Sequence, residues 1–255
     1  MRNATISLLV VTLSVGLTGC QSVSTGAVGD VTVEASPTTG LRASYRARTL
    51  ATLSGSGTRA LAEAQKSASV GHRYLLEVTA VEADAFDVRI TSERFDGVIN
   101  ARFGRDWTPI KFGAESQGQY TDLDVTTFPV LGEAFRLLRD LSGRWKMGQE
   151  KPWKWTMSMP PQMQVGMQGR ARLKKVARLD GRPAAEFEYD ASGEGEYNGS
   201  PLRVSVHGQC WIDLATGFSL ETKTSSRAMF SQSGQPVLVD IKEERTLDRR
   251  DSAGL

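Results

Sequence analysis

The chain has 255 residues, of which 40% are hydrophobic and 24% are charged, proportions typical of a globular protein rather than a disordered one. Its formal net charge is only +2 at pH 7, so no strongly basic field predicts binding to nucleic acid or to another polyanion. At this length the chain forms either one large domain or two small ones.

The N-terminus has the pattern of a secretory signal peptide. Arg2 precedes an apolar run over residues 4–18, which at about 15 residues is shorter than the roughly 18 to 20 needed to cross a bilayer. The run ends in Leu17-Thr18-Gly19-Cys20, in the order aliphatic, small, small, cysteine. This tetrapeptide resembles the lipobox of bacterial lipoproteins. The resemblance implies that residues 1–19 are a signal peptide and that Cys20 becomes the lipidated first residue; the alternative is a signal peptide with a chance cysteine.

The same resemblance implies a location. Lipoproteins of this kind carry three acyl chains, and each buried methylene contributes about 0.8 kcal/mol, so the chains would hold the protein on its membrane. Gln21 follows the cysteine, where Asp is the usual inner-membrane retention signal in enteric-type bacteria. We therefore expect an outer-membrane lipoprotein that faces the periplasm. Removal of Arg2 with the signal peptide would lower the formal charge from +2 to +1.

Composition divides the rest of the chain. Residues 20–40 are expected to form the lipidated N-terminus and a flexible tether, because "QSVSTGAVGDVTVEASPTTG" is small, polar and poor in aromatic residues. A single β-rich domain is expected over residues 41–248, and a disordered tail over residues 249–255. The first part of the domain, residues 41–70, fits a helix or a strand, and its neighbours favour a strand.

Alternation of apolar and polar residues begins near His72 and predicts antiparallel hairpins. Turns are expected near Ala83-Asp84 and at Asp96-Gly97. The residues expected to face the core are Tyr74, Leu76, Val78, Phe86, Val88 and Ile90.

One helix is predicted over residues 129–141. Pro129 stands near its start and Gly143 follows its end, as helix boundaries prefer. Its apolar residues fall on one face, so we expect it to lie across a sheet; they are Leu131, Ala134, Phe135, Leu138 and Leu141.

The chain then returns to segments of about 10 to 16 residues, longer than the usual strand of about five or six. They are separated by turn signals at Asp180-Gly181, Asn198-Gly199, Thr216-Gly217 and Ser233-Gly234. The predicted fold is therefore mainly β: a long-stranded antiparallel meander that forms a curved sheet or half-barrel, with two strand-rich halves joined by the helix. No βαβ alternation is present, which excludes Rossmann and TIM architectures.

This layout resembles the half-barrel lipid and lipoprotein carriers of the bacterial envelope, including the lipoprotein-localisation factors, in which helices plug the concave face of a curved sheet. It is also similar to uncharacterised β-rich outer-membrane lipoproteins with a Trp…Pro…Val-Gly segment, which Trp155, Pro160 and Val165-Gly166 would supply.

Residues with catalytic potential are few. Cys210 and His207 are three apart on one predicted strand, so they point to opposite faces and do not form a nucleophile–base pair. Cys210 shares the apolar face and would have no disulfide partner if Cys20 carries lipid, so we expect it to be buried and reduced. The acidic residues between Glu186 and Glu196 could bind calcium or act as a glycosidase pair, but their alternation with Phe and Tyr favours a solvated face. "IKEERTLDRRD" is interpreted as a charged edge strand.

The segment "KPWKWTMSMPPQMQVGM" is the most distinctive. Trp153, Trp155, Met157 and Met159 occupy alternate positions, which predicts one apolar face of a strand, ended by Pro160-Pro161. Three readings stay open. The face is core if the helix covers it, a pocket for an acyl chain if the cover is partial, or a Cu(I) site built from methionine sulfurs.

Taken together, these patterns predict a non-enzymatic, periplasm-facing outer-membrane lipoprotein that binds a hydrophobic ligand or an envelope protein. No catalytic residue, metal or cofactor is predicted, and Trp153, Trp155, Met157 and Met159 are the candidate ligand-binding residues. The alternative is a structural or assembly-accessory lipoprotein that joins a complex through an exposed strand edge. The third possibility is an envelope hydrolase.

Overall fold

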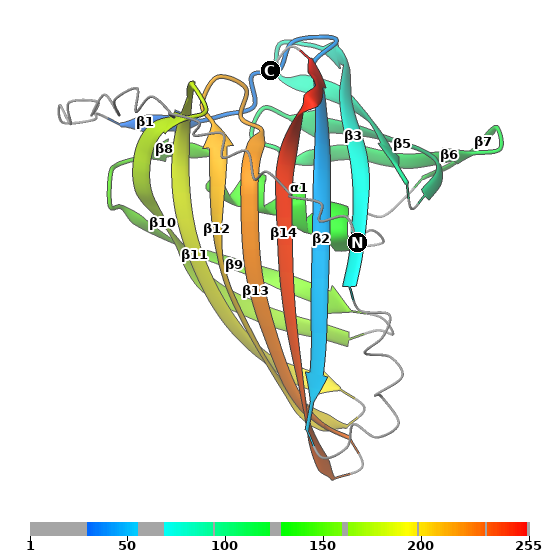
Figure 1. Cartoon of the computed structure of the whole chain (residues 1–255), viewed down its shortest axis with the longest axis vertical. Coiled ribbons are helices and arrows are strands. Elements are labelled where there is room, and N and C mark those ends of the chain that lie inside the picture. The colour runs from blue at the N-terminus through cyan, green and yellow to red at the C-terminus, as the bar shows by residue number, and fades with distance from the viewer. Residues whose placement is uncertain are drawn as a thin grey trace, which may run out of the picture.

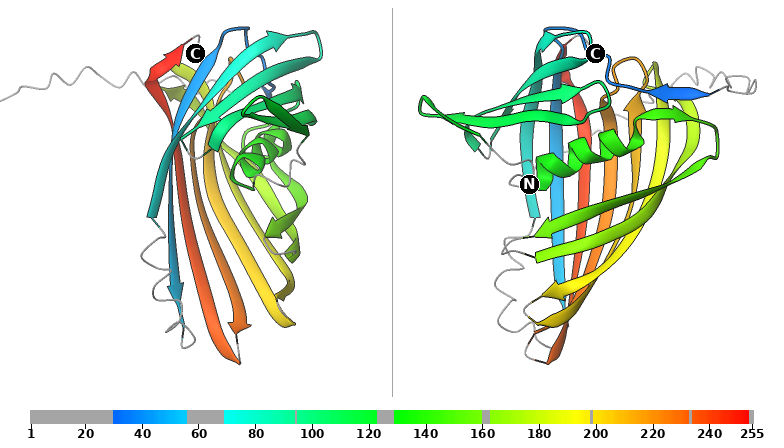
Figure 2. Two further views of the ribbon diagram at one scale, coloured as in Figure 1. Left: turned by 90° about the vertical axis from the view of Figure 1, so that its right-hand side faces the viewer. Right: turned by 180° about the vertical axis from the view of Figure 1, so that it is seen from behind.

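The computed structural model describes residues 30–55, 69–93, 95–122, 129–159, 163–197, 199–232 and 234–253. Twelve strands form a single antiparallel sheet that curves strongly along its length, and one helix lies on its concave side (Figure 1, Figure 2). The sheet is open, since its two edge strands do not pair with each other in the described structure. The predicted mainly β fold, a curved meander with one helix packed on it, is confirmed.

The sheet consists of two meanders that meet in its middle. The first contains β2 (Arg42–Ser54), β3 (Ser69–Val81), β4 (Ala85–Ser92), β5 (Phe95–Gly104), β6 (Pro109–Ser116) and β7 (Gln119–Asp122). The second contains β9 (Glu150–Met159), β10 (Met163–Leu179), β11 (Arg182–Tyr197), β12 (Ser200–Asp213), β13 (Ser219–Gln232) and β14 (Gln235–Ala253).

The last strand closes the gap between the halves. β14 pairs with β2 from the other end of the chain, so the spatial order is β7-β6-β5-β4-β3-β2-β14-β13-β12-β11-β10-β9. The edges are therefore β7 and β9, which the chain connects through the helix α1 (Pro129–Leu141). Figure 2 shows that α1 itself lies across the concave face, over strands of the second half.

The bounds of α1 agree with the predicted helix, residues 129–141. Of its expected inward residues, Phe135, Leu138 and Leu141 are buried, whereas the side chains of Leu131 and Ala134 lie outside the described part. Gly143 has a φ of 100°, a conformation that favours glycine just beyond a helix end. Among the described residues, no helix is long and apolar enough to cross a membrane.

An aromatic cluster holds α1 against the sheet. Trp107, fully buried in the turn between β5 and β6, stacks on Phe135 of α1 with ring centroids 5.7 Å apart. It also meets Phe86 and Phe218 edge-on at 5.2 Å and 5.0 Å, and Phe103 contacts Phe135 at 4.6 Å. Because these rings come from both halves of the sheet, the cluster joins the two meanders as well as the helix.

The strand faces follow the predicted alternation. The residues expected to face the core in β3 and β4, from Tyr74 to Ile90, are all buried. The turn expected at Asp96-Gly97 is wrong, because both residues belong to β5. The chain reverses before them, where Ser92 of β4 pairs with Phe95 of β5. An Asp-Gly pair favours a turn but also occurs near the start of a strand when tertiary pairing decides the register.

The flexible tether over residues 20–40 is corrected in its second part. Residues 31–33 form β1 (Val31–Val33), which pairs with β8 (Gly143–Trp145), and Val31, Val33 and Ala35 are buried. The backbone N–H of Ala35 donates to the carbonyl of Arg105 at 2.8 Å. The segment "VTVEAS" alternates apolar and polar residues, which is a strand pattern. The alternation is short, however, and the polar composition around it led to the prediction of a tether. Residues 20–29, including Cys20, lie outside the described residues.

The disordered tail expected over residues 249–255 is also corrected as far as Ala253; residues 254 and 255 lie outside the described residues. β14 continues to Ala253, which pairs with Arg42 after a register shift that follows Asp248. Ser252 anchors this end, since its hydroxyl accepts a hydrogen bond from the backbone N–H of Ser44 at 3.1 Å and donates to the Asp248 carbonyl at 2.6 Å. Charged composition suggested disorder, but the backbone groups of β2 provide partners that composition does not reveal.

Candidate functional site

The register of the second meander places the tryptophans of β9 on the concave face. Residues paired directly across neighbouring strands share a face of a sheet. One row across the sheet runs Trp153, Gly169, Ala191, Val206, Ser226, Ile241, and the next runs Trp155, Met167, Gly193, Val204, Ala228, Val239. Gly169, Ala191 and Gly193 are the small residues of these rows, and the larger side chains beside Gly169 and Gly193 lie over them.

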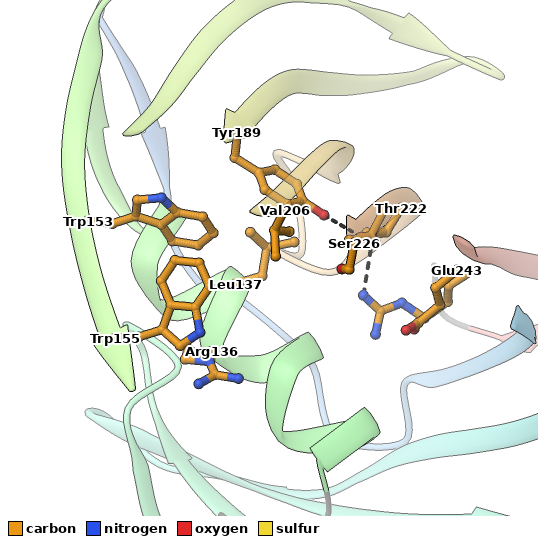
Figure 3. Close-up of a pocket in the computed structure, with 11 residues that line it drawn as sticks. Arg136, Leu137, Trp153, Trp155, Tyr189, Val206, Thr222, Ser226 and Glu243 are labelled. Atoms are coloured by element: carbon orange, nitrogen blue, oxygen red, sulfur yellow. Dashed lines mark hydrogen bonds between the residues drawn. The ribbon is translucent and has the colours of Figure 1, made fainter. Parts of the chain in front are cut away.

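A cavity of about 60 Å³ lies on this face beneath α1 (Figure 3). Its wall on one side is Trp153 and Trp155, and its roof is Arg136 and Leu137 of α1. The floor and the opposite wall come from four strands, β11 to β14, and contain both apolar and polar groups; they are Tyr189, Val206, Thr222, Thr224, Ser226, Glu243 and Arg245.

The aromatic wall is a contiguous stack. The Trp153 and Trp155 rings lie 4.5 Å apart at 46°, and Tyr189 meets Trp153 edge-on at 5.5 Å. The Arg136 guanidinium lies 5.8 Å from the Trp155 ring, which favours a cation–π contact. Both tryptophans remain half-buried, so part of each ring faces the cavity and solvent.

Two glycines make room for these rings. A Cβ atom on Gly169 would lie 2.3 Å from the Trp153 Nε1, and one on Gly208 would lie 2.3 Å from the Tyr189 Cζ. Both distances are far shorter than any contact between real side chains. The aromatic rings therefore lie against bare backbone of the neighbouring strand, which widens the space above them.

The opposite wall is polar although most of it is shielded from water. Arg245 is only 5% exposed, and its Nη2 donates to the Thr222 hydroxyl at 3.3 Å. The hydroxyls of Tyr189 and Thr224 lie 2.6 Å apart, and burial raises the pKa of Tyr189 above its ordinary value. Tyr189 is consequently a neutral hydrogen-bonding group at physiological pH.

The structure brings two of the four candidate ligand-binding residues to this cavity, Trp153 and Trp155. Met157 and Met159 pair in register with Val165 and Met163, but their side chains lie outside the described part of the chain. For the two tryptophans, the structure supports both the core and the pocket interpretation. They contact the core along one edge and line the cavity along the other.

Glu243 and Arg245 were missed by the sequence reading, which treated "IKEERTLDRRD" as a charged edge strand. That interpretation is wrong, because β14 lies in the middle of the sheet between β13 and β2. The sequence did contain evidence for an inward position. Ile241, Glu243, Arg245 and Leu247 are alternate residues, so in a strand all four lie on the same face as the apolar pair.

Cys210 and His207 occupy opposite faces, as predicted. Cys210 is fully buried and forms no disulfide among the described residues, and burial raises the pKa of its thiol to about 11. Its Sγ lies 3.4 Å from the Thr222 hydroxyl, whereas His207 is exposed on the convex face. The thiol is therefore protonated near neutral pH and has no imidazole beside it.

The acidic residues of β11 lie on the outer face in contact with basic partners. Glu188 pairs with Lys174 at 2.9 Å, and Glu194 pairs with Arg203 at 3.2 Å. Within the described ranges, no group of three or more His, Cys, Asp or Glu side chains is arranged to hold a metal ion.

No model of a known protein family matches the chain, and no curated protein is significantly similar to it in sequence. Function must therefore be inferred from the cavity and from the N-terminal sequence.

Proposed function

We propose that this protein is a non-enzymatic lipoprotein of the bacterial outer membrane, anchored through lipid on Cys20 and facing the periplasm. On this proposal, it binds a hydrophobic ligand at the concave-face cavity. The observation that carries the binding role is the position of Trp153 and Trp155, two large aromatic side chains that α1 covers only in part. Concave, mostly apolar sites with a few polar groups are typical of ligand pockets.

The volume of the cavity limits how a ligand would lie. A space of about 60 Å³ holds several water-sized groups, each of which needs roughly 10–15 Å³, and cannot enclose a long acyl chain. One end of the ligand would therefore enter the cavity. The rest would follow the inner face away from α1, where Ala228, Val239 and Leu53 are half-buried.

A binding role fits the chemistry of the lining better than catalysis. Nucleophilic catalysis needs an activated group next to a base. The Tyr189 hydroxyl is instead kept protonated by burial and paired with Thr224, and the Cys210 thiol is protonated for the same reason. Besides Tyr189, the lining has as polar side chains three hydroxyls, one carboxylate and two guanidinium groups, which position ligands well.

The ligand test is native mass spectrometry of the purified full chain, followed by lipid extraction. We expect a co-purifying apolar molecule, and we expect Trp155→Ala to reduce its occupancy. Trp211→Ala is the matched control, because Trp211 is half-buried outside the lining of the cavity. Absence of any bound lipid, together with no change in tryptophan fluorescence when a fatty acid or fatty alcohol is added, would refute the ligand-binding role.

The second candidate, an assembly-accessory lipoprotein, is favoured by the open edges of the sheet. All four residues of β7 are exposed, and β7 pairs only with β6 in the described structure. An exposed strand edge offers free backbone groups to another chain. Co-precipitation from cross-linked envelopes separates the two functions: a partner lost when Thr121→Pro disrupts β7 would support assembly, whereas undisturbed partners would argue against it.

A further inference from the structure

We propose that the cavity recognises the carboxylate head of a singly charged, fatty-acid-like amphiphile through Arg245. This rests on the proposed binding function and specifies its ligand class. The head would lie at the polar wall formed by β13 and β14, and the chain would lie against Trp153 and Trp155 on the opposite wall.

Arg245 is the first support. It is 5% exposed, and burial of a charge is costly unless the charge is paired and hydrogen-bonded. Its guanidinium donates to the Thr222 hydroxyl and also interacts with the Tyr74 side chain, but its buried Nε has no hydrogen-bond partner among the described residues. A guanidinium stays protonated in proteins and presents its donors in a fork that matches a carboxylate. The group is thus charged, buried and incompletely paired at the edge of a cavity.

The nearest carboxylate does not complete the pairing. Burial disfavours the charged form of Arg245, whereas Tyr74 of β3 and then Glu243, two residues away on the same face of β14, favour it. Among the described residues, however, no carboxylate comes within 4.0 Å of the Arg245 guanidinium. An anionic ligand would supply the close partner that the protein itself does not.

The lining of the cavity contains two guanidinium groups, those of Arg136 and Arg245, and one carboxylate, that of Glu243. Arg136 lies 5.8 Å from the Trp155 ring on the aromatic side. Arg245 is therefore the guanidinium at the polar wall, where the head of a ligand would lie.

A carboxylate head fits this site, because its three heavy atoms need little more room than a few water molecules and the cavity of about 60 Å³ holds several. The Thr222 hydroxyl, which accepts a hydrogen bond from Arg245, offers a further donor to a carboxylate oxygen. Across the cavity, the half-buried rings of Trp153 and Trp155 present apolar surface to the first methylenes of the chain.

The experiment compares two probes with the same chain, bromine-tagged dodecanoate and bromine-tagged dodecanol. Bromine quenches nearby tryptophans, so titration of the full chain in a neutral detergent reports occupancy beside Trp153 and Trp155. The detergent takes up the same amount of each probe whichever variant is titrated. The result is therefore the ratio of dodecanoate affinity to dodecanol affinity, compared between variants. We expect dodecanoate to bind about 10-fold to 100-fold more tightly than dodecanol, the range of a charge-assisted hydrogen bond.

Two variants that should change the affinity for dodecanoate in opposite directions test the role of Arg245. Arg245→Met should remove the preference for dodecanoate while leaving dodecanol binding, with circular dichroism as the check on folding. Glu243→Gln should increase dodecanoate affinity by several-fold and leave dodecanol unchanged, because it removes the competing negative charge. Since Glu243→Gln is nearly isosteric, it keeps the proposal testable if Arg245→Met does not fold.

The outcomes separate the two proposals. Equal affinity for both probes, or a ratio unchanged by Glu243→Gln, would overturn the carboxylate assignment and leave hydrophobic ligand binding intact. Tighter binding of lysophosphatidylglycerol than of dodecanoate would likewise overturn it. If neither probe quenches tryptophan and no lipid co-purifies, the proposed binding function itself fails.

Discussion

The aromatic ring of Tyr189 lies against Gly208 of the neighbouring strand, so closely that a Cβ atom at position 208 would come within 2.3 Å of Tyr189 Cζ. This contact sets the depth of the cavity floor. It holds the Tyr189 hydroxyl at 2.6 Å from that of Thr224 and aligns the ring edge-on with Trp153. Because Gly208 has no Cβ atom, the Tyr189 ring can lie in this position, and its contacts with Thr224 and Trp153 depend on it.

We therefore predict that Gly208→Ala lowers the free energy of unfolding by about 1–3 kcal/mol, the usual cost of overpacking a core. The added methyl must push the Tyr189 ring toward the cavity, so tryptophan emission should change as well. Gly166→Ala is the matched control, because a Cβ atom there meets nothing within 4 Å. Urea unfolding of the two variants checks the prediction, and equal stabilities would contradict it.

Trp107 should be the most sensitive position in the cluster that fixes α1. Trp107→Ala removes a fully buried ring that contacts Phe86, Phe135 and Phe218, so we expect a loss of about 3–5 kcal/mol. Trp211→Ala, at a half-buried position, should cost clearly less. Thermal and denaturant unfolding measure both losses. Similar values for the two variants would mean that the cluster does not anchor the helix.

Cys210 should resist thiol reagents in the folded protein. It is fully buried, and burial raises the pKa of the thiol to about 11, so almost no thiolate is present near neutral pH. We expect labelling by iodoacetamide only after addition of denaturant, followed by mass spectrometry of the peptide that contains Cys210. Rapid labelling of the native protein would show that the site opens.

The same pKa shift makes stability depend on pH. The folded thiol holds its proton more tightly than the unfolded thiol, so its contribution is full below the unfolded pKa of about 8.5 and is lost as pH rises toward 11. Burial also raises the pKa values of Tyr45, Tyr74 and Tyr189, which adds a common background. Between pH ~8 and ~10.5, wild type should therefore lose more stability than Cys210→Ala, by on the order of 2 kcal/mol. An equal loss of stability in wild type and Cys210→Ala over this pH range would contradict the prediction.

Cys20→Ala should abolish membrane retention through lipid, because no other residue of the Leu17-Thr18-Gly19-Cys20 motif can be acylated on sulfur. The checks are incorporation of labelled palmitate and partition into a detergent phase. Gln21→Ala, which leaves the cysteine in place, is the control and should remain lipidated. An unchanged detergent-phase fraction for Cys20→Ala would exclude the anchor.

Local patterns in the sequence determined the elements of this protein. Alternation of period two identified the inward residues of β3 and β4, and helical spacing with Pro129 and Gly143 located α1. The same alternation placed Trp153 and Trp155 on one face of a strand. These predictions succeeded because the face on which a side chain lies depends only on backbone geometry over a few residues.

Only the tertiary structure decided how those elements meet. The pairing of β14 with β2 joins residues about 200 positions apart, a separation that no local period encodes. That pairing turns Arg245 from a supposed edge residue into a buried cation, and it gives partners to the C-terminal residues up to Ala253. Likewise, Trp107 lies in a polar turn with no periodicity, and only packing of α1 against the curved sheet buries it. The cavity exists because long-range contacts, not local propensity, set the distance between the Trp153 wall and β14.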